Sequence, residues 1–267
     1  MVLFVVIPMT IGIYYIKMPK QVRHDNNVFI NTENIYQPIY TEMRERNTKA
    51  MLDGNVKPDV ILNKQEDPRR GIGLFAFGKF VLNKQFTQVL REAGSLFSNQ
   101  VVYSLDPEVA STQALLHCTI FQFFGVESID PRFQPEVLKQ YDEVLSDVLS
   151  QVPPFTVTYA GIIAVPSGLL MYGYPSININ SMRDEIRAKL DERHILYKEP
   201  YKSDIVHSTL MRLRNPVAPT ELLNFAKKYG DTDLGTLRVT DVALCYASWR
   251  MRPNEVKNVH EYQLQSR

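Results

Sequence analysis

Apolar and polar positions along residues 71–150 predict strands and amphipathic helices in turn. Leu74–Phe77 is a short apolar run that is typical of a strand, and a second strand-like run surrounds His117. Apolar residues at helical spacing predict one helix before this second run and one after it. Their apolar stripes are Phe86, Val89, Leu90, Ala93 and Phe97, and then Phe133, Val137, Tyr141, Leu145 and Val148.

Residues 151–267 repeat this order of elements. Phe155–Val165 and Leu169–Tyr174 predict a hairpin around Pro166, Ser167 and Gly168. The remaining predicted elements are a helix starting near Asn180 or Ser181 with the stripe Met182, Ile186 and Leu190, a strand around His207, a helix from Pro219 to Gly230, and closing strands at Val239–Ala247 and near Tyr262. The order predicts a bilobal, pseudo-two-fold α+β domain over 71–267, with lobes at about 71–150 and 151–267 and a central cleft.

The first segment of the chain has a different pattern. Residues 1–16 hold no charged side chain, and a helix of that length would reach about 24 Å, short of the roughly 30 Å hydrocarbon core of a bilayer. Lys17, Lys20 and Arg23 follow it, which favours a cytoplasmic location for the rest of the chain. We expect a membrane anchor here, with a packed N-terminal segment or a cleaved signal as the alternatives.

Residues 17–70 form a polar stretch between this segment and the folded domain. One helix is predicted there, near Pro38–Leu52. The charged run Glu66–Arg70 is typical of the end of a linker on the surface, although its two arginines could contact a phosphate. We therefore expect a linker with one helix.

Composition limits the kinds of partner that the chain can have. A chain of 267 residues that is 45% hydrophobic can bury a full core, and a formal charge of +1 lacks the basic excess of proteins that bind long nucleic acids. A nucleotide or short RNA is the more natural partner, and we expect a monomer. The two cysteines, Cys118 and Cys245, do not indicate a disulfide framework. The sequence also shows none of the common zinc, phosphate-loop or dinucleotide motifs.

Two copies of one tetrad carry the candidate chemistry. His117-Cys118-Thr119-Ile120 and His207-Ser208-Thr209-Leu210 share the pattern His-x-Thr-apolar, and each lies in a strand-like run. Side chains alternate faces along a strand, so the histidine and threonine of each tetrad point the same way. Two such strands side by side would present two imidazoles and two hydroxyls to one cleft.

This set of groups suits in-line displacement at phosphorus. One imidazole can take a proton from the attacking oxygen while the other gives a proton to the leaving oxygen. Threonine hydroxyls can donate to the phosphoryl oxygens on which charge develops. Each tetrad alone is typical of a half-buried strand with one hydrogen-bonded histidine; the pair, placed alike in two similar halves, indicates a catalytic site.

On these residues the chain resembles the 2H phosphoesterase superfamily, over roughly Gly71 to the C-terminus. The run His207-Ser208-Thr209-Leu210-Met211-Arg212 is similar to that of the bacterial RNA-ligase-like 2′,3′-cyclic nucleotide phosphodiesterases. The resemblance implies two antiparallel sheets flanked by helices, and assigns Arg212 a phosphate-side or structural role. It implies 2′,3′-cyclic phosphates, 2′-5′ oligoadenylates, RNA 3′ ends or cyclic dinucleotides as substrates. No metal or other cofactor is expected.

Candidates for base recognition are less specific. Tyr172, Tyr174, Tyr201 and Trp249 lie near predicted strand ends, where a ring could stack on a base, although such a residue is more often a packing residue. Lys202 could attract phosphate or remain on the surface. Cys118 is predicted to point away from His117 into the core.

We therefore predict a metal-independent phosphodiesterase that cleaves a ribonucleotide bond by two-histidine acid–base catalysis at His117, Thr119, His207 and Thr209. The alternative is a membrane-tethered nucleotide-binding module with the same fold and no turnover. Metal-assisted hydrolysis is a further alternative, and it needs a third ligand that the two strands do not supply.

Overall fold

The structure is a computed structural model that describes residues 32–64, 67–102, 116–126, 135–248, 250–251 and 255–265. The segment 1–16, for which we expect a membrane anchor, lies outside these ranges, as does Trp249. Within these ranges no helix combines the length and the apolar character that a membrane span requires.

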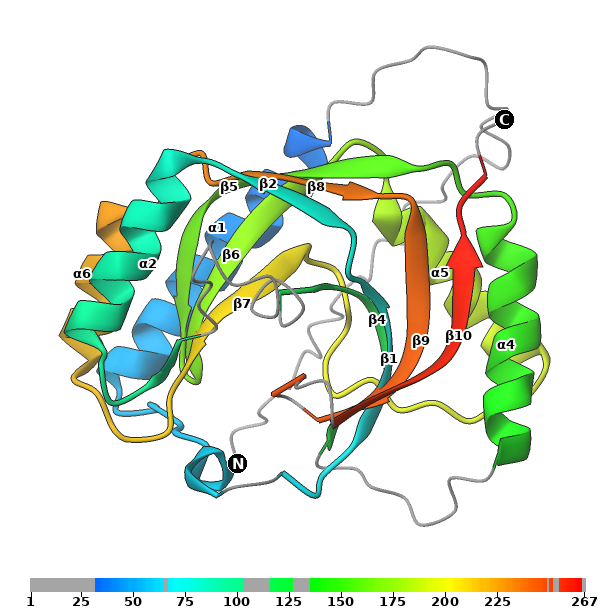
Figure 1. The fold of residues 1–267 in the computed structure, drawn as a ribbon, viewed down its shortest axis with the longest axis horizontal. Coiled ribbons are helices and arrows are strands. Elements are labelled where there is room, and N and C mark those ends of the chain that lie inside the picture. The colour runs from blue at the N-terminus through cyan, green and yellow to red at the C-terminus, as the bar shows by residue number, and fades with distance from the viewer. Residues whose placement is uncertain are drawn as a thin grey trace, which may run out of the picture.

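Two antiparallel sheets form the centre of the fold (Figure 1). The four-stranded sheet has the order β10-β9-β1-β4, and its strands are β1 (Gly71–Ala76), β4 (Cys118–Phe124), β9 (Asp241–Ala247) and β10 (Val256–Gln263). The six-stranded sheet has the order β2-β8-β5-β6-β7-β3. Its strands are β2 (Lys79–Leu82), β3 (Val101–Val102), β5 (Phe155–Val165), β6 (Gly168–Pro175), β7 (His207–Arg212) and β8 (Gly235–Val239). The expected α+β architecture of two antiparallel sheets flanked by helices is confirmed.

Helices cover the outer sides of the two sheets. Figure 1 shows α2 and α6 on one flank and α4 and α5 on the other. The helices are α1 (Glu33–Leu52), α2 (Lys84–Leu96), α4 (Pro135–Leu149), α5 (Ile179–Glu192) and α6 (Pro219–Lys228), with a short 3-10 helix at Val60–Asn63. Short polar side chains cap two of them, since Asn83 accepts a hydrogen bond from the backbone N–H of Phe86 and Asn178 accepts one from that of Asn180. Each helix predicted between Pro38 and Gly230 is present.

The division of the strands between the sheets differs from the expected one. Strands β1 and β4 pair with β9 and β10 from the end of the chain, whereas β2 and β3 join the sheet built around the β5–β6 hairpin. The two lobes therefore do not coincide with the sequence halves 71–150 and 151–267. Local periodicity assigns a residue to a face of a strand, but it carries no information on which distant strand will be its neighbour.

Helix α1 is part of the folded domain, in contrast to the polar linker expected over 17–70. Tyr36, Tyr40 and Met51 are fully buried in the main core. The Tyr40 hydroxyl donates to the carbonyl of Gly173 at 2.6 Å and accepts from the backbone N–H of Val206 at 3.1 Å. These bonds tie α1 to β6 and to the residue that precedes β7.

The charged segment that follows α1 is likewise packed. Asp67 is fully buried, and Arg69 Nη2 lies 2.8 Å from its Oδ2 atom and 2.5 Å from Asp59 Oδ2. The backbone N–H of Asp67 donates to Glu255. This network fastens the chain ahead of β1, so Arg69 serves the fold.

Candidate active site

The two tetrads enter the structure at equivalent points. His117 immediately precedes β4, and His207 is the first residue of β7. The two strands belong to different sheets and lie next to each other. Each histidine therefore stands where its strand begins, at the junction of the two sheets.

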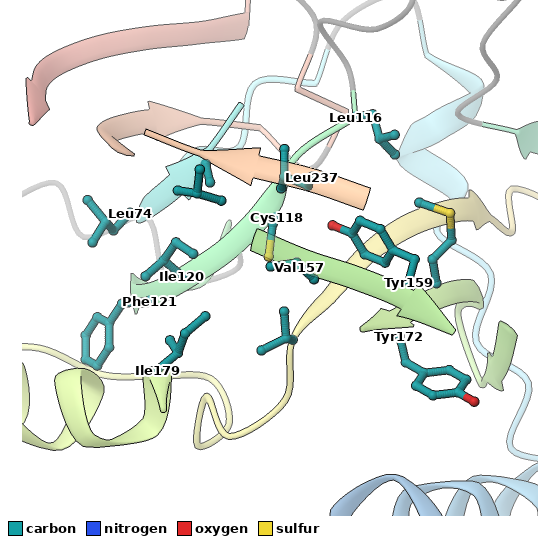
Figure 2. Packing of buried hydrophobic residues seen from close by; sticks show 14 of the residues in the cluster. Leu74, Leu116, Cys118, Ile120, Phe121, Val157, Tyr159, Tyr172, Ile179 and Leu237 are labelled. Atoms are coloured by element: carbon teal, nitrogen blue, oxygen red, sulfur yellow. The ribbon is translucent and has the colours of Figure 1, made fainter. Parts of the chain in front are cut away.

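The side chains of each tetrad alternate as predicted. Cys118 is fully buried, and Figure 2 shows it among core residues that include Val157 and Tyr159. Burial raises the pKa of the Cys118 thiol to about 11, so the thiol stays protonated at neutral pH. Ser208, in the matching position of the second tetrad, is hydrogen-bonded to the Tyr159 hydroxyl at 2.6 Å. The two x positions thus face the core.

The histidines and threonines face a cavity of about 490 Å³ between the sheets. His117, Thr119, His207 and Thr209 all line it, together with Arg212, Tyr201 and Lys202. The two tetrads are 90 positions apart in the sequence (207 − 117). The fold brings the histidine and the threonine of each tetrad to one concave site. A pocket of this size can hold a nucleotide-sized molecule.

Aromatic rings hold the first histidine. The His117 ring is largely buried, and the Phe75 ring meets it edge-on, with centroids 5.3 Å apart and an interplanar angle of 87°. Phe77 lies on another side, with a centroid distance of 6.1 Å. These contacts restrict the orientation of the imidazole that faces the cavity.

The second histidine is held in its neutral form. Burial, followed by the charges of His117, Arg183 and Arg212, lowers the pKa of His207 from its usual value to about 3. Its Nδ1 atom is buried and has no hydrogen-bond partner among the described residues. A neutral imidazole has a lone pair that can accept a proton, which is the form that a general base takes before the reaction.

Arg183 is a residue of this site that the sequence did not reveal. It is almost completely buried on α5 and reaches β4 and the segment that leads into β7. Its Nε atom donates to the Ile120 carbonyl at 2.6 Å, and Nη2 donates to the carbonyls of Thr119 at 3.3 Å and of Ile205 at 2.8 Å. One guanidinium thus links β4 to the segment that leads into β7.

The position of Arg183 did carry a weak signal. It lies one helical turn before Ile186 and two turns before Leu190, on the predicted buried stripe of its helix. Arginine is rarely buried in full unless its donors are satisfied, and here backbone carbonyls satisfy them. Those carbonyls come from distant segments, so the sequence alone could not identify them.

Tyr201 and Lys202 lie on a turn that is fixed by ionic contacts. Arg187 Nε lies 2.7 Å from Glu199 Oε1, and Glu199 accepts a hydrogen bond from the backbone N–H of Ser203 at 2.9 Å. The bonds close the turn at both ends and leave the Tyr201 side chain 55% exposed beside the cavity. Both residues therefore line the candidate site, and their part in substrate binding stays a prediction.

Gly125 allows this turn to approach the end of β4. A Cβ atom at residue 125 would come within 3.2 Å of the Pro200 ring, closer than side chains ordinarily pack. Both residues line the cavity. The glycine that follows the first tetrad therefore permits a close contact within the site wall.

Tyr172 and Tyr174 do not line this cavity, which corrects their assignment as substrate-binding residues. Helix α1 covers both: Arg44 lies over the Tyr172 ring at 4.6 Å, and Tyr174 is hydrogen-bonded to Gln37. The Tyr172 hydroxyl donates to the Gly230 carbonyl at 2.8 Å. Their place at a predicted strand end could not show that a helix from the N-terminal region would occupy the adjacent space.

Helix α1 also lines the cavity, through five residues that carry no functional signal in the sequence: Ile39, Glu42, Met43, Arg46 and Asn47.

In the part of the chain that the structure covers, no three His, Cys, Asp or Glu side chains are grouped as metal ligands would be.

Fold and site together define a two-sheet α+β protein with paired His–Thr strands facing one cavity. The chain is similar to the crystal structure of TT0787 of Thermus thermophilus, with 16% identity, a TM-score of 0.48, and coverage of 73% of this chain and 97% of that chain. It is also similar to E. coli LigT complexed with phosphate, with 12% identity, a TM-score of 0.39, and coverage of 75% and 100%.

A third similar structure is titled simply a phosphoesterase, at 14% identity and a TM-score of 0.39, with 74% of this chain and 100% of that chain covered. No family model matches the sequence, and neither does any curated protein.

Proposed function

We propose that this protein is a 2H-type phosphodiesterase that cleaves a ribonucleotide phosphodiester without a metal ion. The observation that carries the proposal is the meeting of His117, Thr119, His207 and Thr209, from two strands, on the wall of one cavity. A site that only binds a nucleotide has no need of two proton carriers, whereas displacement at phosphorus needs both.

The environments of the two histidines support different roles. His207, whose lowered pKa keeps it neutral, takes the proton from the attacking oxygen as that oxygen forms a bond to phosphorus. His117 then gives a proton to the ribose oxygen as its bond to phosphorus breaks. The hydroxyls of Thr119 and Thr209 donate to the non-bridging oxygens, and Arg212 adds positive charge at the same wall.

The attacking oxygen depends on the bond that is cleaved. For a 2′,3′-cyclic phosphate it belongs to water, and the product is a phosphomonoester. For a 2′-5′ or 3′-5′ bond, including an RNA 3′ end or a cyclic dinucleotide, the neighbouring ribose hydroxyl attacks and leaves a cyclic phosphate. In both reactions the attacking oxygen loses one proton and the leaving oxygen gains one. The same pair of histidines can therefore catalyse either reaction.

A substrate panel tests the proposal. The full chain is incubated in chelator with a 2′,3′-cyclic nucleotide, 2′-5′ and 3′-5′ oligoadenylates and a 2′-3′-linked cyclic dinucleotide, and products are separated by chromatography. We expect at least one substrate to be cleaved in chelator. Nucleotide binding without any product would instead indicate a binding module, and activity that chelator abolishes would indicate metal-assisted hydrolysis.

The pH dependence of kcat/KM should reflect the lowered pKa of His207. A general base loses activity only below its own pKa, so the acidic limb should lie well below pH 6.5, the usual region for histidine. Arg212→Gln removes one of the charges that lower this pKa, so its acidic limb should move to higher pH. Rate profiles from about pH 3 to 9 would show this shift, and an acidic limb at or above pH 6.5 in the wild type would contradict the role of His207.

A further inference from the structure

Helix α1 has two faces with different surroundings. Tyr36 and Tyr40 are buried against the six-stranded sheet and its neighbours. The cavity-lining residues Ile39, Glu42, Met43, Arg46 and Asn47 recur at intervals of three and four, so they form one continuous band on the helix. Asn47 lies two turns after Tyr40, where this band meets the buried stripe. A whole helical face therefore forms a wall of the candidate active site.

The direction of α1 places the end of this face near the second tetrad. Tyr40 is bonded to Gly173, near the end of β6, and the chain after the helix returns to the start of that strand, where the Lys57 N–H donates to the Pro166 carbonyl at 2.8 Å. Helix α1 thus runs antiparallel to β6. Asn47, two turns beyond Tyr40, lies toward Leu170, which is the register partner of Thr209.

Asn47 gives this wall a buried side-chain hydrogen-bond donor. Its side chain lines the cavity, the residue is only 9% exposed, and its Nδ2 atom has no hydrogen-bond partner among the described residues. A buried N–H donor without a partner costs free energy, so such a donor facing a cavity indicates a ligand that brings an acceptor.

The other side chains of the wall narrow the chemistry of that ligand. Ile39 and Met43 are partly buried and apolar, which suits the face of a flat ring. Arg46 has a side chain that is 68% exposed, and its contact with Glu42, at 4.0 Å, is long. An apolar surface, one fixed donor and a cation at the rim match a nucleobase with acceptor atoms on its edge, joined to a phosphate-bearing ribose.

This wall is distinct from the turn that carries Tyr201. The turn packs on the end of β4 through Pro200 and Gly125, whereas Asn47 lies toward the Thr209 position of β7. The cavity therefore has two surfaces suited to a nucleoside, and the histidine pair lines the same cavity.

We propose that the α1 face binds a second nucleoside, so that the substrate carries a nucleoside on each side of the phosphodiester. The proposal rests on the proposed function and narrows its substrate class. A dinucleoside phosphate or a cyclic dinucleotide would occupy both surfaces, whereas a 2′,3′-cyclic mononucleotide would leave one of them unused.

The test compares Asn47→Leu and Asn47→Ala with the wild-type full chain on 2′-5′ ApA, 3′-5′ ApA and 2′,3′-cyclic AMP. Leucine keeps the volume and removes the donor. We expect KM for the cleaved ApA isomer to rise about tenfold, the size of one lost hydrogen bond, while KM for cyclic AMP changes less than about twofold. The matched control is Thr41→Val, since Thr41 is exposed on the same helix and bonds only to the Gln37 carbonyl in the described contacts.

The outcomes distinguish a failure of the α1 subsite from a failure of the proposed phosphodiesterase activity. An equal change in KM for ApA and cyclic AMP, or no change for either, would overturn the α1 subsite and leave the phosphodiesterase intact. Cleavage of neither substrate by the wild type would count against the proposed function. Binding would then test the subsite alone: a Kd for ApA that rises about tenfold in Asn47→Leu, with the Kd for AMP unchanged, supports it, and equal Kd values overturn it.

Discussion

Replacing His117 or His207 with alanine should lower kcat on the cleaved substrate by about 10² to 10⁴, which is the range that a general acid or base contributes. Both imidazoles face the same cavity, and each is expected to move one of the two protons of the reaction. Removing either one leaves the attacking oxygen without a base or the leaving oxygen without an acid. Steady-state rates near neutral pH on the substrate identified by the panel would measure the loss.

The control for this prediction is His194→Ala. His194 is exposed at the end of α5 and does not line the cavity, so its removal should leave kcat unchanged. Circular dichroism and thermal unfolding would verify that all three variants fold. Near wild-type turnover in a folded His117 or His207 variant would contradict the two-histidine mechanism.

Replacing Arg183 with methionine should produce the second large effect, on both stability and turnover. Methionine fills similar space but leaves the carbonyls of Thr119, Ile120 and Ile205 without their donor, so we expect the free energy of unfolding to fall by about 3 kcal/mol. Because the same bonds link β4 to the segment that leads into His207, kcat should fall by about 10- to 100-fold. Arg183→Lys should recover part of both losses, since lysine keeps the charge but not the planar set of donors.

The pH dependence of kcat/KM distinguishes a purely structural role for Arg183 from a role in positioning the catalytic site. The Arg183 charge is among the causes that lower the pKa of His207, so the acidic limb of kcat/KM should move to higher pH in Arg183→Met and less in Arg183→Lys. Arg193→Met, at the exposed C-terminal end of the same helix, is the control and should change stability by less than about 0.5 kcal/mol. An unchanged kcat and pH profile in folded Arg183→Met would show that this residue does not position the site.

Local signals in the sequence were sufficient for most of the elements. The β5–β6 hairpin is present as expected, because apolar runs bounded by proline and glycine specify strands and turns over a few residues. Strand alternation also placed Cys118 and Ser208 in the core and the histidines and threonines on the opposite face. One prediction of this kind needed correction: the apolar run Val239–Ala247 contains the end of β8 and all of β9, which belong to different sheets.

What the sequence by itself determined was the set of chemical groups and the face of each strand on which they lie, since both follow from residue type and a repeat of about two or 3.6 residues. Only the tertiary structure decided which strands are neighbours and that α1 covers Tyr172 and Tyr174 while lining the site with Asn47. It also decided that Arg183 joins β4 to the segment that leads into β7. These contacts join residues far apart along the chain. They depend on the packing of whole elements, for which local periodicity carries no signal.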